Sequence, residues 1–129
     1  MLLADDNHAI CELVVLMLED IVDVTAVHDG EAAVRLAAER PFDVILLDQR
    51  MPRLDGPGAL RTIRSRPGPN RDIPALAFSA EGDHASVSRA TEQGFCGLVL
   101  KPFSGPELVS AIAAAVTTST IPELEGARE

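Results

Sequence analysis

The chain alternates between short apolar runs and segments with helical spacing, and this alternation constrains its fold more than any other feature. The apolar or β-branched runs occupy residues 1–4, 22–27, 44–47, 74–78 and 98–100. The run at 44–47 is continuous, as in strands that are buried on both faces of a parallel sheet. Five strands alternating with five helices predict a doubly wound α/β fold, with helices on both faces of a five-stranded parallel sheet.

Polar residues stand where several of the helices should begin. Apolar residues recur at three- and four-residue spacing from Ile10 to Ile21, which predicts an amphipathic helix with Asn7 as its N-cap. Asp29 is a candidate cap for a second helix, which Pro41 would end. Further helices are expected at residues 58–65, at 81–93 and, capped by Ser104, up to about residue 117.

The length of 129 residues suits one domain. We expect this domain at residues 1–117, followed at 118–129 by a polar tail or linker stub that frays. No apolar run approaches the ~20 residues of a membrane span and no leader precedes the fold, so we expect a cytoplasmic protein without membrane contact. Cys11 and Cys96 both follow apolar residues and are expected to be reduced core residues.

The charge of the chain argues against one class of partner. A formal net charge of -9 repels nucleic-acid phosphates, and no cluster of basic residues offers a local exception. The chain has neither Trp nor Tyr, and its four Phe residues are not interleaved with basic residues as in a stacking platform. Direct binding of nucleic acid is therefore not expected.

Polar side chains directly follow four of the five predicted strands. They are Asp5 and Asp6, Asp48, Ser79 with Ala80 beside it, and Lys101. Because ligands of doubly wound sheets bind at the carboxyl ends of the strands, we expect these residues to share one pocket. Three close carboxylates repel one another unless a cation compensates them. Ligation by oxygen alone favours a hard divalent ion, first of all Mg²⁺.

A carboxylate beside Mg²⁺ and a lysine is suited to phosphoryl transfer, because the two cations neutralise the transferring group and a hydroxyl donates a hydrogen bond to it. Each of these residues alone is common as a helix cap, but caps do not explain all four strand ends together. Lys101 is the single lysine in a chain with ten arginines. Its compact ammonium suits a spot shared by a carboxylate and a phosphoryl oxygen.

These motifs resemble the receiver domain of bacterial two-component response regulators, the CheY-like phosphoacceptor family. The resemblance extends over about residues 1–117 and rests on Asp5-Asp6, Asp48 with Met51-Pro52 and Asp55-Gly56, Ser79-Ala80, and Lys101-Pro102-Phe103. It implies a five-stranded sheet in the order 2-1-3-4-5. It also implies a signalling domain that catalyses only its own phosphorylation and dephosphorylation, rather than a turnover enzyme.

The resemblance assigns a role to each strand-end residue. Asp48 would accept a phosphoryl group from a phosphohistidine on a histidine kinase or a histidine phosphotransfer protein. Mg²⁺ would be bound by Asp6, by Asp48, by the Arg50 carbonyl and, chiefly through a water, by Asp5.

Lys101 would pair with Asp48 and then with the phosphoryl oxygens, and the bond from Lys101 to Pro102 would be cis. Ser79 would move to donate a hydrogen bond to the phosphoryl group, and Ala80 would keep the approach open for the donor.

The sequence departs from the family pattern near this site. The switch position three residues before the lysine is usually Tyr or Phe and here is Leu98, which puts the usual coupling of hydroxyl and aromatic ring in question. Ser79 replaces the more frequent Thr. Arg50 and Glu81 occupy positions that modulate hydrolysis of the acyl phosphate in this family, and we hypothesise a contact between them across the mouth of the site.

Receivers usually dimerise or bind effectors through the face formed by the fourth helix, the fifth strand and the last helix. His84, Val87 and Thr91 are candidate exposed positions on that face. The chain is interpreted either as a single-domain regulator or phosphorelay shuttle, or as a receiver taken from a hybrid kinase or a larger regulator.

Three other functions fit less well. A Mg²⁺-dependent phosphohydrolase would carry a second Asp where this chain has Arg50. A nucleotide-binding module would need a Gly-rich first turn instead of Asp5-Asp6-Asn7. A receiver that signals without phosphate would have no need of the complete set of strand-end residues. The histidines His8, His28 and His84 lack metal-ligand spacing and are expected at the surface or at caps.

Overall fold

A five-stranded parallel sheet forms the centre of the molecule. The computed structural model describes residues 1–80 and 84–128, with side chains for 1–80 and 85–117. The strands are paired in the order β2-β1-β3-β4-β5, as predicted. Their bounds are β1 (Leu2–Ala4), β2 (Thr25–Val27), β3 (Ile45–Asp48), β4 (Ala75–Ser79) and β5 (Gly97–Leu100).

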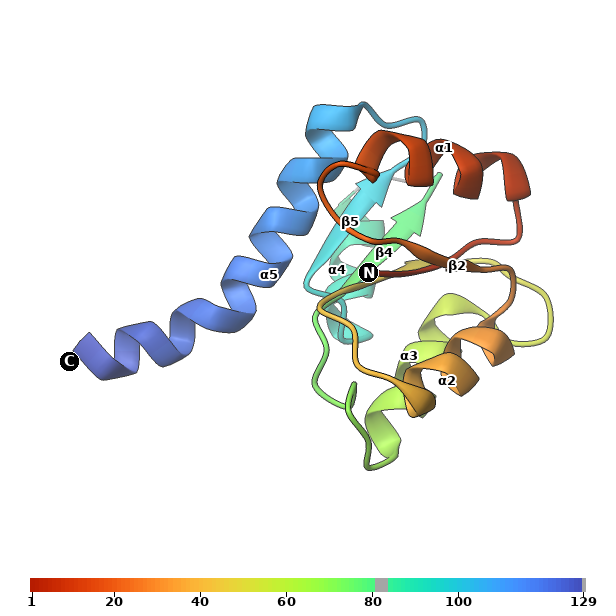
Figure 1. The fold of residues 1–129 in the computed structure, drawn as a ribbon. Helices are drawn as coiled ribbons and strands as arrows, with labels where there is room; N and C mark the ends of the chain where they lie inside the picture. The colour runs from red at the N-terminus through yellow and green to blue at the C-terminus, as the bar shows by residue number, and fades with distance from the viewer. Residues whose placement is uncertain (81–83, 129) are drawn as a thin grey trace.

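Helices cover both faces of the sheet and divide its core in two. They are α1 (His8–Leu18), α2 (Gly30–Glu39), α3 (Gly56–Ser65), α4 (His84–Glu92) and α5 (Gly105–Arg128). Leu2, Ile45 and their same-face neighbours pack against α2, α3 and α4, whereas Leu3 and Leu46 pack against α1 and α5. Figure 1 shows α1 on one side of the sheet and α2 and α3 on the other. Alternate residues of each buried strand therefore supply the two cores.

Side-chain caps begin four of these helices, α1, α2, α3 and α5. Asn7 Oδ1 accepts from Ile10 N at 3.2 Å and Asp29 Oδ1 accepts from Ala32 N at 2.7 Å, which confirms both predicted caps. Ser104 and Glu107 exchange reciprocal bonds of 3.2 Å at the start of α5, the arrangement known as a capping box. The carboxylate of Asp55 also caps α3 through Gly58 N at 2.7 Å, a role that its place in the sequence motif did not indicate.

Three sequence-based expectations are wrong: the end of the first helix, the burial of Cys96 and the end of the last helix. The first helix ends at Leu18, because the amides of Ile21 and Val22 both bond to the Leu18 carbonyl in a closing turn; Ile21 is 60% exposed. Cys11 is buried, but Cys96 is exposed beside the edge strand β5, and the preceding Phe95 fills the core instead.

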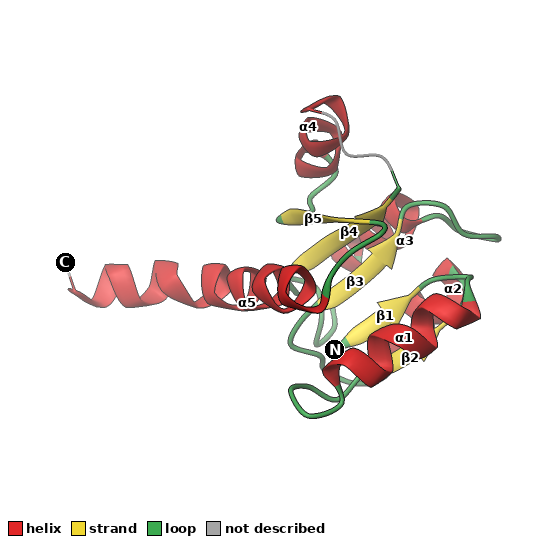
Figure 2. Ribbon diagram, turned by 90° about the horizontal axis from the view of Figure 1, so that it is seen from above, coloured by secondary structure: helices red, strands yellow, loops and turns green. Residues whose placement is uncertain are grey.

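The last helix also differs from expectation. Its backbone continues past residue 117 to Arg128, and Figure 2 shows it extending far beyond the sheet. Glu123, Leu124 and Ala127 at this end are good helix formers, whereas Pro122 and Gly126 are not, so residue preferences alone do not explain the extension.

Two further features bear on the expectations above. The peptide bond from Lys101 to Pro102 is cis, as the family resemblance implied. Within the described part of the chain, no helix combines the length and the apolar character that crossing a membrane requires.

Candidate functional site

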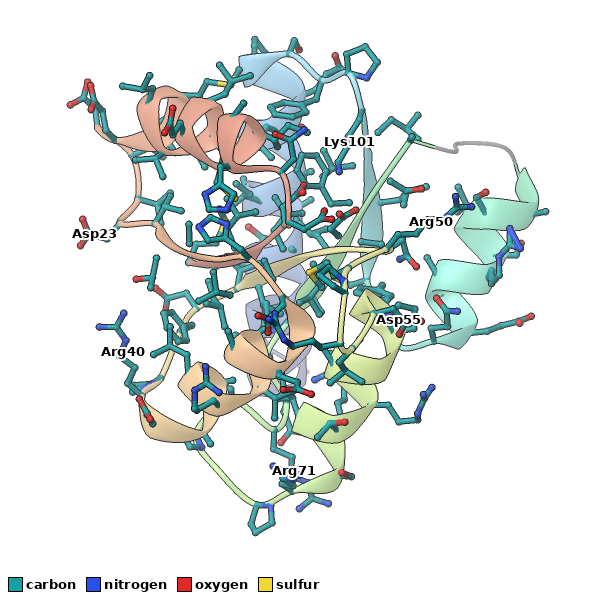
Figure 3. The ribbon with its side chains drawn as sticks, turned by 90° about the vertical axis from the view of Figure 1, so that its right-hand side faces the viewer. Asp23, Arg40, Arg50, Asp55, Arg71 and Lys101 are labelled. Carbon is teal, nitrogen blue, oxygen red and sulfur yellow. The ribbon has the colours of Figure 1, made fainter. Side chains whose placement is uncertain are left out.

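The carboxyl ends of the strands bring the predicted site residues to one edge of the sheet. Asp48 is paired in register with Phe78, and Ser79 with Leu100, so that Asp48, Ser79 and Lys101 end neighbouring strands. Asp5 directly follows Ala4, whose partner in β3 is Leu47. Figure 3 shows the side chains around this edge, with Lys101 and Arg50 labelled.

Lys101 lies between two carboxylates. Its Nζ is 2.9 Å from Asp5 Oδ2 and 3.2 Å from Asp48 Oδ1, and it stands 4.6 Å from the centre of the Phe78 ring. Burial acts to lower the pKa of Lys101, but the close contacts with Asp5 and Asp48 and their negative charges outweigh it and raise the pKa above its ordinary value. The ammonium therefore stays charged. The contact with Asp5 adds a second partner to the Asp48 contact that the family resemblance implied.

The surroundings of Asp48 disfavour the ionised form of its carboxyl group. It is only 7% exposed, and burial together with the charge of Asp5 raises its pKa to about 6 in spite of Lys101. Proton binding and cation binding both relieve this repulsion. At neutral pH the group is ionised and therefore able to act as a nucleophile.

Asp5 is fully buried, and its two carboxylate oxygens have different surroundings. Oδ1 accepts from Asn7 N at 2.9 Å. Oδ2 is ion-paired with Lys101 but has no hydrogen bond of regular geometry within the described residues. A buried carboxylate oxygen without such a bond is costly unless a cation approaches it.

The carboxylates can together hold a metal ion. One oxygen each of Asp5, Asp6 and Asp48 lies within 4.8 Å of the others. Asp6 is exposed whereas the other two are buried, so the group opens to solvent on one side. The all-oxygen donor set, in which Asp5 Oδ2 is paired with Lys101 alone among the described residues, fits Mg²⁺, which keeps several waters when bound by one or two carboxylates.

A hollow of about 230 Å³ opens onto Asp48. Its lining residues are Asp48, Gln49, Arg50, Ser79, Ala80 and Lys101. At ~30 Å³ for each water molecule, it has room for a phosphoryl group and several waters. The predicted nucleophile, hydroxyl, ammonium and small access residue thus face one common space, beside Arg50, whose carbonyl is a predicted ligand.

Leu98 does not fill the space beside Ser79. It is half-buried and packs against the core on the α2–α3–α4 side. A second hollow, of about 300 Å³, lies between α3 and α4 and is lined by Gln49, Ser79, Arg89 and Leu98 among others. Arg89 was not a sequence-based candidate, since nothing in its local pattern places it beside the strand ends. The hypothesised contact between Arg50 and Glu81 lies outside the described residues on the Glu81 side.

The backbone of the turn that carries Asp5 and Asp6 has its own partners. The Asp5 carbonyl oxygen lies 3.1 Å from His28 Nδ1 and 3.4 Å from Cys11 Sγ. Burial raises the pKa of the Cys11 thiol to about 11, so that it remains a donor. The His28 ring stacks on His8 with 3.7 Å between ring centres. The sequence analysis expected His8 and His28 at the surface or at caps and did not predict these contacts.

Known proteins match the chain over most of its length. Residues 1–113 match the family described as the response regulator receiver domain. A protein of Rhizobium etli named "Probable chemotaxis protein CheY" is 32% identical over 91 residues, which are 70% of each chain. The transcriptional regulatory protein CseB of Streptomyces coelicolor is 37% identical over 88% of this chain and 47% of its own length. The chain thus spans about half the length of such transcriptional regulators.

Solved structures agree with these relatives. The receiver domain of a sensor histidine kinase of Pseudomonas aeruginosa, solved with a magnesium ion coordinated in its active-site cleft, superposes with a TM-score of 0.81 at 32% identity, covering 90% of this chain and 95% of that one. A response regulator receiver domain of Francisella gives a TM-score of 0.83 at 28% identity, with 92% and 96% covered. The sequence match, the strand order and the cluster of strand-end residues lead to one conclusion: this chain belongs to the response regulator receiver family, the phosphoacceptor signalling domains of two-component systems.

Proposed function

We propose that Asp48 accepts a phosphoryl group from a phosphohistidine of a histidine kinase or a histidine phosphotransfer protein, and that the acyl phosphate then alters partner binding. The observation that carries this proposal is the position of Lys101, ion-paired with both Asp5 and Asp48 beside an open hollow. An ionised nucleophile, a fixed ammonium and space for the incoming group are what phosphoryl transfer requires of a protein.

In the transfer step, an oxygen of Asp48 forms a bond to phosphorus while the bond from phosphorus to the imidazole nitrogen breaks. The electron pair of that bond returns to the imidazole. Asp6, Asp48, the Arg50 carbonyl and, chiefly through a water, Asp5 would hold Mg²⁺. When bound, the ion offsets the negative charge of the carboxylates and the phosphoryl oxygens.

The other residues of the hollow act on the transferred group. Lys101, already 3.2 Å from Asp48, pairs with a phosphoryl oxygen after transfer. Ser79 donates its hydroxyl hydrogen to another oxygen and draws its loop inward. Ala80 presents only a methyl group and leaves room for the donor.

The output surface is the face made by α4, β5 and α5, for a second copy of the chain or for an effector. Val87 is 48% and Leu100 42% exposed there, and Thr91 is exposed too. The side chain of His84 lies outside the described part. A hollow of about 370 Å³ between β5 and α5 is lined by Leu98, Leu100 and Phe103 among others. With Leu98 at the switch position, the movement of Ser79 reaches this face through packing of an aliphatic side chain and not through reorientation of a ring.

In this proposal the chain has no substrate turnover beyond its own phosphorylation and dephosphorylation, and it acts in the cytoplasm. It works either as a single-domain regulator or shuttle, or as the receiver of a hybrid kinase or larger regulator. Its relatives include a protein named CheY, of which the match covers 70%, and longer transcriptional regulators, of which it covers about half, so both arrangements are kept in the proposal.

The test is the intact mass of the protein after incubation with Mg²⁺ and acetyl phosphate. We expect one labile phosphoryl adduct on the wild type and none on Asp48→Asn. Asp43→Asn is the matched control, because Asp43 is an exposed aspartate near the opposite end of β3. An adduct that persists in Asp48→Asn would contradict the proposal. A wild type that forms no adduct and also binds no beryllofluoride would contradict the proposal as well. Beryllofluoride binding distinguishes this outcome from an adduct that forms but is hydrolysed too fast to be trapped.

A further inference from the structure

The turn from β1 to α1 carries both Asp5 and Asp6, and the side chains of His28 and Cys11 contact its backbone. The Asp5 carbonyl oxygen lies 3.1 Å from His28 Nδ1 and 3.4 Å from Cys11 Sγ. Because a carbonyl oxygen only accepts, the imidazole N–H and the thiol are the donors. We infer that His28 and Cys11 are positioning residues that orient the Asp5–Asp6 pair for Mg²⁺, an inference that rests on the function proposed above.

The Asp5 carbonyl that accepts these hydrogen bonds is rigidly linked to Asp6. The carbonyl of Asp5 and the amide of Asp6 belong to one planar peptide group. Donors that fix the direction of this carbonyl therefore fix the plane from which Asp6 projects. Asp6 is exposed, so its own packing constrains it little, whereas Asp5 is held by Asn7 and Lys101 as well. The effect of His28 and Cys11 should thus be felt mainly through Asp6.

His28 is itself held firmly enough to position another group. It follows β2 directly, and the backbone of the two strands is joined at this point because Asp5 N donates to Val27 O at 3.1 Å. Its ring stacks on His8, the first residue of α1, with 19° between the ring planes. The end of β2 and the start of α1 thus fix the imidazole from two sides.

The same cluster is not arranged as a metal centre. Cys11 Sγ and His28 Nδ1 are 3.8 Å apart, but the rings of His8 and His28 are stacked face to face, so their nitrogen lone pairs cannot converge on one ion. Among the described residues, the ligand atoms that do converge are those of Asp5, Asp6 and Asp48. The histidine and the thiol therefore act on the backbone of that group and not as ligands.

Two substitutions at His28 separate its hydrogen bond from its bulk. His28→Phe keeps a ring that stacks on His8 and removes the donor. His28→Asn removes the ring but keeps an N–H at the same number of bonds from Cβ as Nδ1. Calorimetric titration of the unphosphorylated protein with Mg²⁺ should show affinity weakened about tenfold in His28→Phe, the scale typical of lost outer contacts at metal sites, and close to wild type in His28→Asn.

The double variant His28→Phe/Cys11→Ala removes both donors and should bind Mg²⁺ more weakly than either single variant. In metal-free protein, the amide nitrogen resonance of Asp6 should move in His28→Phe and stay in place in His28→Asn. Wild-type affinity in the double variant, or equal losses in His28→Phe and His28→Asn, would overturn the inference while leaving the proposed function intact. A wild type that binds no Mg²⁺ would overturn the proposed function and this inference with it.

Discussion

Asn70, in the loop before β4, and Asp5, at the end of β1, are both almost completely buried polar residues, but the structure treats their polar atoms in opposite ways. Asn70 Nδ2 donates to the carbonyls of Ala37 and Arg40 at 2.7 Å each, and its Oδ1 accepts from Phe42 N at 2.8 Å. Asp5 instead shares its site with another carboxylate, Asp48, and depends on Lys101.

The difference distinguishes a region that stabilises the fold, around Asn70, from a chemically reactive region, around Asp5. A buried polar group whose partners are all neutral and well directed stabilises one conformation. Buried like charges are tolerated only with a cation, and for that reason they respond to metal, protons and phosphoryl groups. The Asn70 loop and the Asp5 site should therefore respond differently to the same perturbations.

The largest effect on stability is expected from Asn70→Ala. The substitution leaves two carbonyls and one amide without their partner, which should lower the free energy of unfolding by about 3 kcal/mol. Urea denaturation measures this, and added Mg²⁺ should not restore it. Ser65→Ala, which removes one exposed hydroxyl contact to Thr62 O, is the control and should change little. A loss below about 1 kcal/mol in Asn70→Ala would remove the contrast between the two regions.

A smaller loss is expected from Lys101→Met, and its character should differ. In EDTA near neutral pH, Asp5 and Asp48 lose their only described ammonium partner. The cost should be about 2 kcal/mol, below the ~3–5 kcal/mol of a fully buried pair, because the Lys101 side chain is 20% exposed and Asp48 can take up a proton instead. Unlike the loss in Asn70→Ala, this one should be largely reversed by Mg²⁺, because the metal ion supplies the missing positive charge. Thermal melts with and without Mg²⁺ test it, and an identical response of the two variants to the metal would contradict it.

Asp48→Asn should stabilise the metal-free protein in a pH-dependent way. The folded pKa of Asp48 is raised to about 6, so the folded state binds the proton more tightly than the unfolded state, whose value is 3.8. This favourable contribution is fully present below the unfolded pKa and is lost as pH rises through the folded pKa. The advantage of Asp48→Asn over wild type should therefore grow between pH 4 and 6 and then level off near 1 kcal/mol, discounted for screening and for the lost Lys101 contact.

Melts of both proteins in EDTA across this pH range provide the measurement. Asp43→Asn, at an exposed position, should show no such growing advantage. A difference between Asp48→Asn and wild type that does not change with pH would mean that Asp48 titrates normally in the folded protein.

The smallest effect is expected from Arg53→Ala. Arg53 pairs with Asp29 at 2.8 Å, but its side chain is 61% exposed, and such pairs contribute about 0.5 kcal/mol or less. Denaturation at low and high salt should show a small loss that salt removes. If Arg53→Ala lowered the free energy of unfolding as much as Lys101→Met does, burial would not explain why the Lys101 ion pairs contribute more than exposed surface pairs.

Much of the fold could be predicted from the sequence because its signals are local. The continuous apolar run before Asp48 marks a buried strand, and Asn7, Asp29 and Ser104 each bond to an amide three residues onward. The convergence of Asp5, Asp48, Ser79 and Lys101 also follows from the pattern alone, because parallel strands end at the same edge of their sheet. The predictions that the first helix reaches Ile21 and that Cys96 is buried were wrong. Both residues are apolar, but the closing turn leaves Ile21 outside the core and the sheet edge leaves Cys96 outside it.

The order of the elements, three of the helix caps and the set of residues at the strand ends were therefore predictable from the sequence alone. Three contacts became evident only in the folded molecule. Lys101 bridges Asp5 as well as Asp48, Asn70 joins the end of α2 to the loop before β4, and His28 contacts the Asp5 carbonyl. The physical reason is the distance along the chain. His28 is 23 residues from Asp5 and Asn70 is 33 from Ala37, and no local spacing rule relates residues so far apart until the sheet and its helices bring them together.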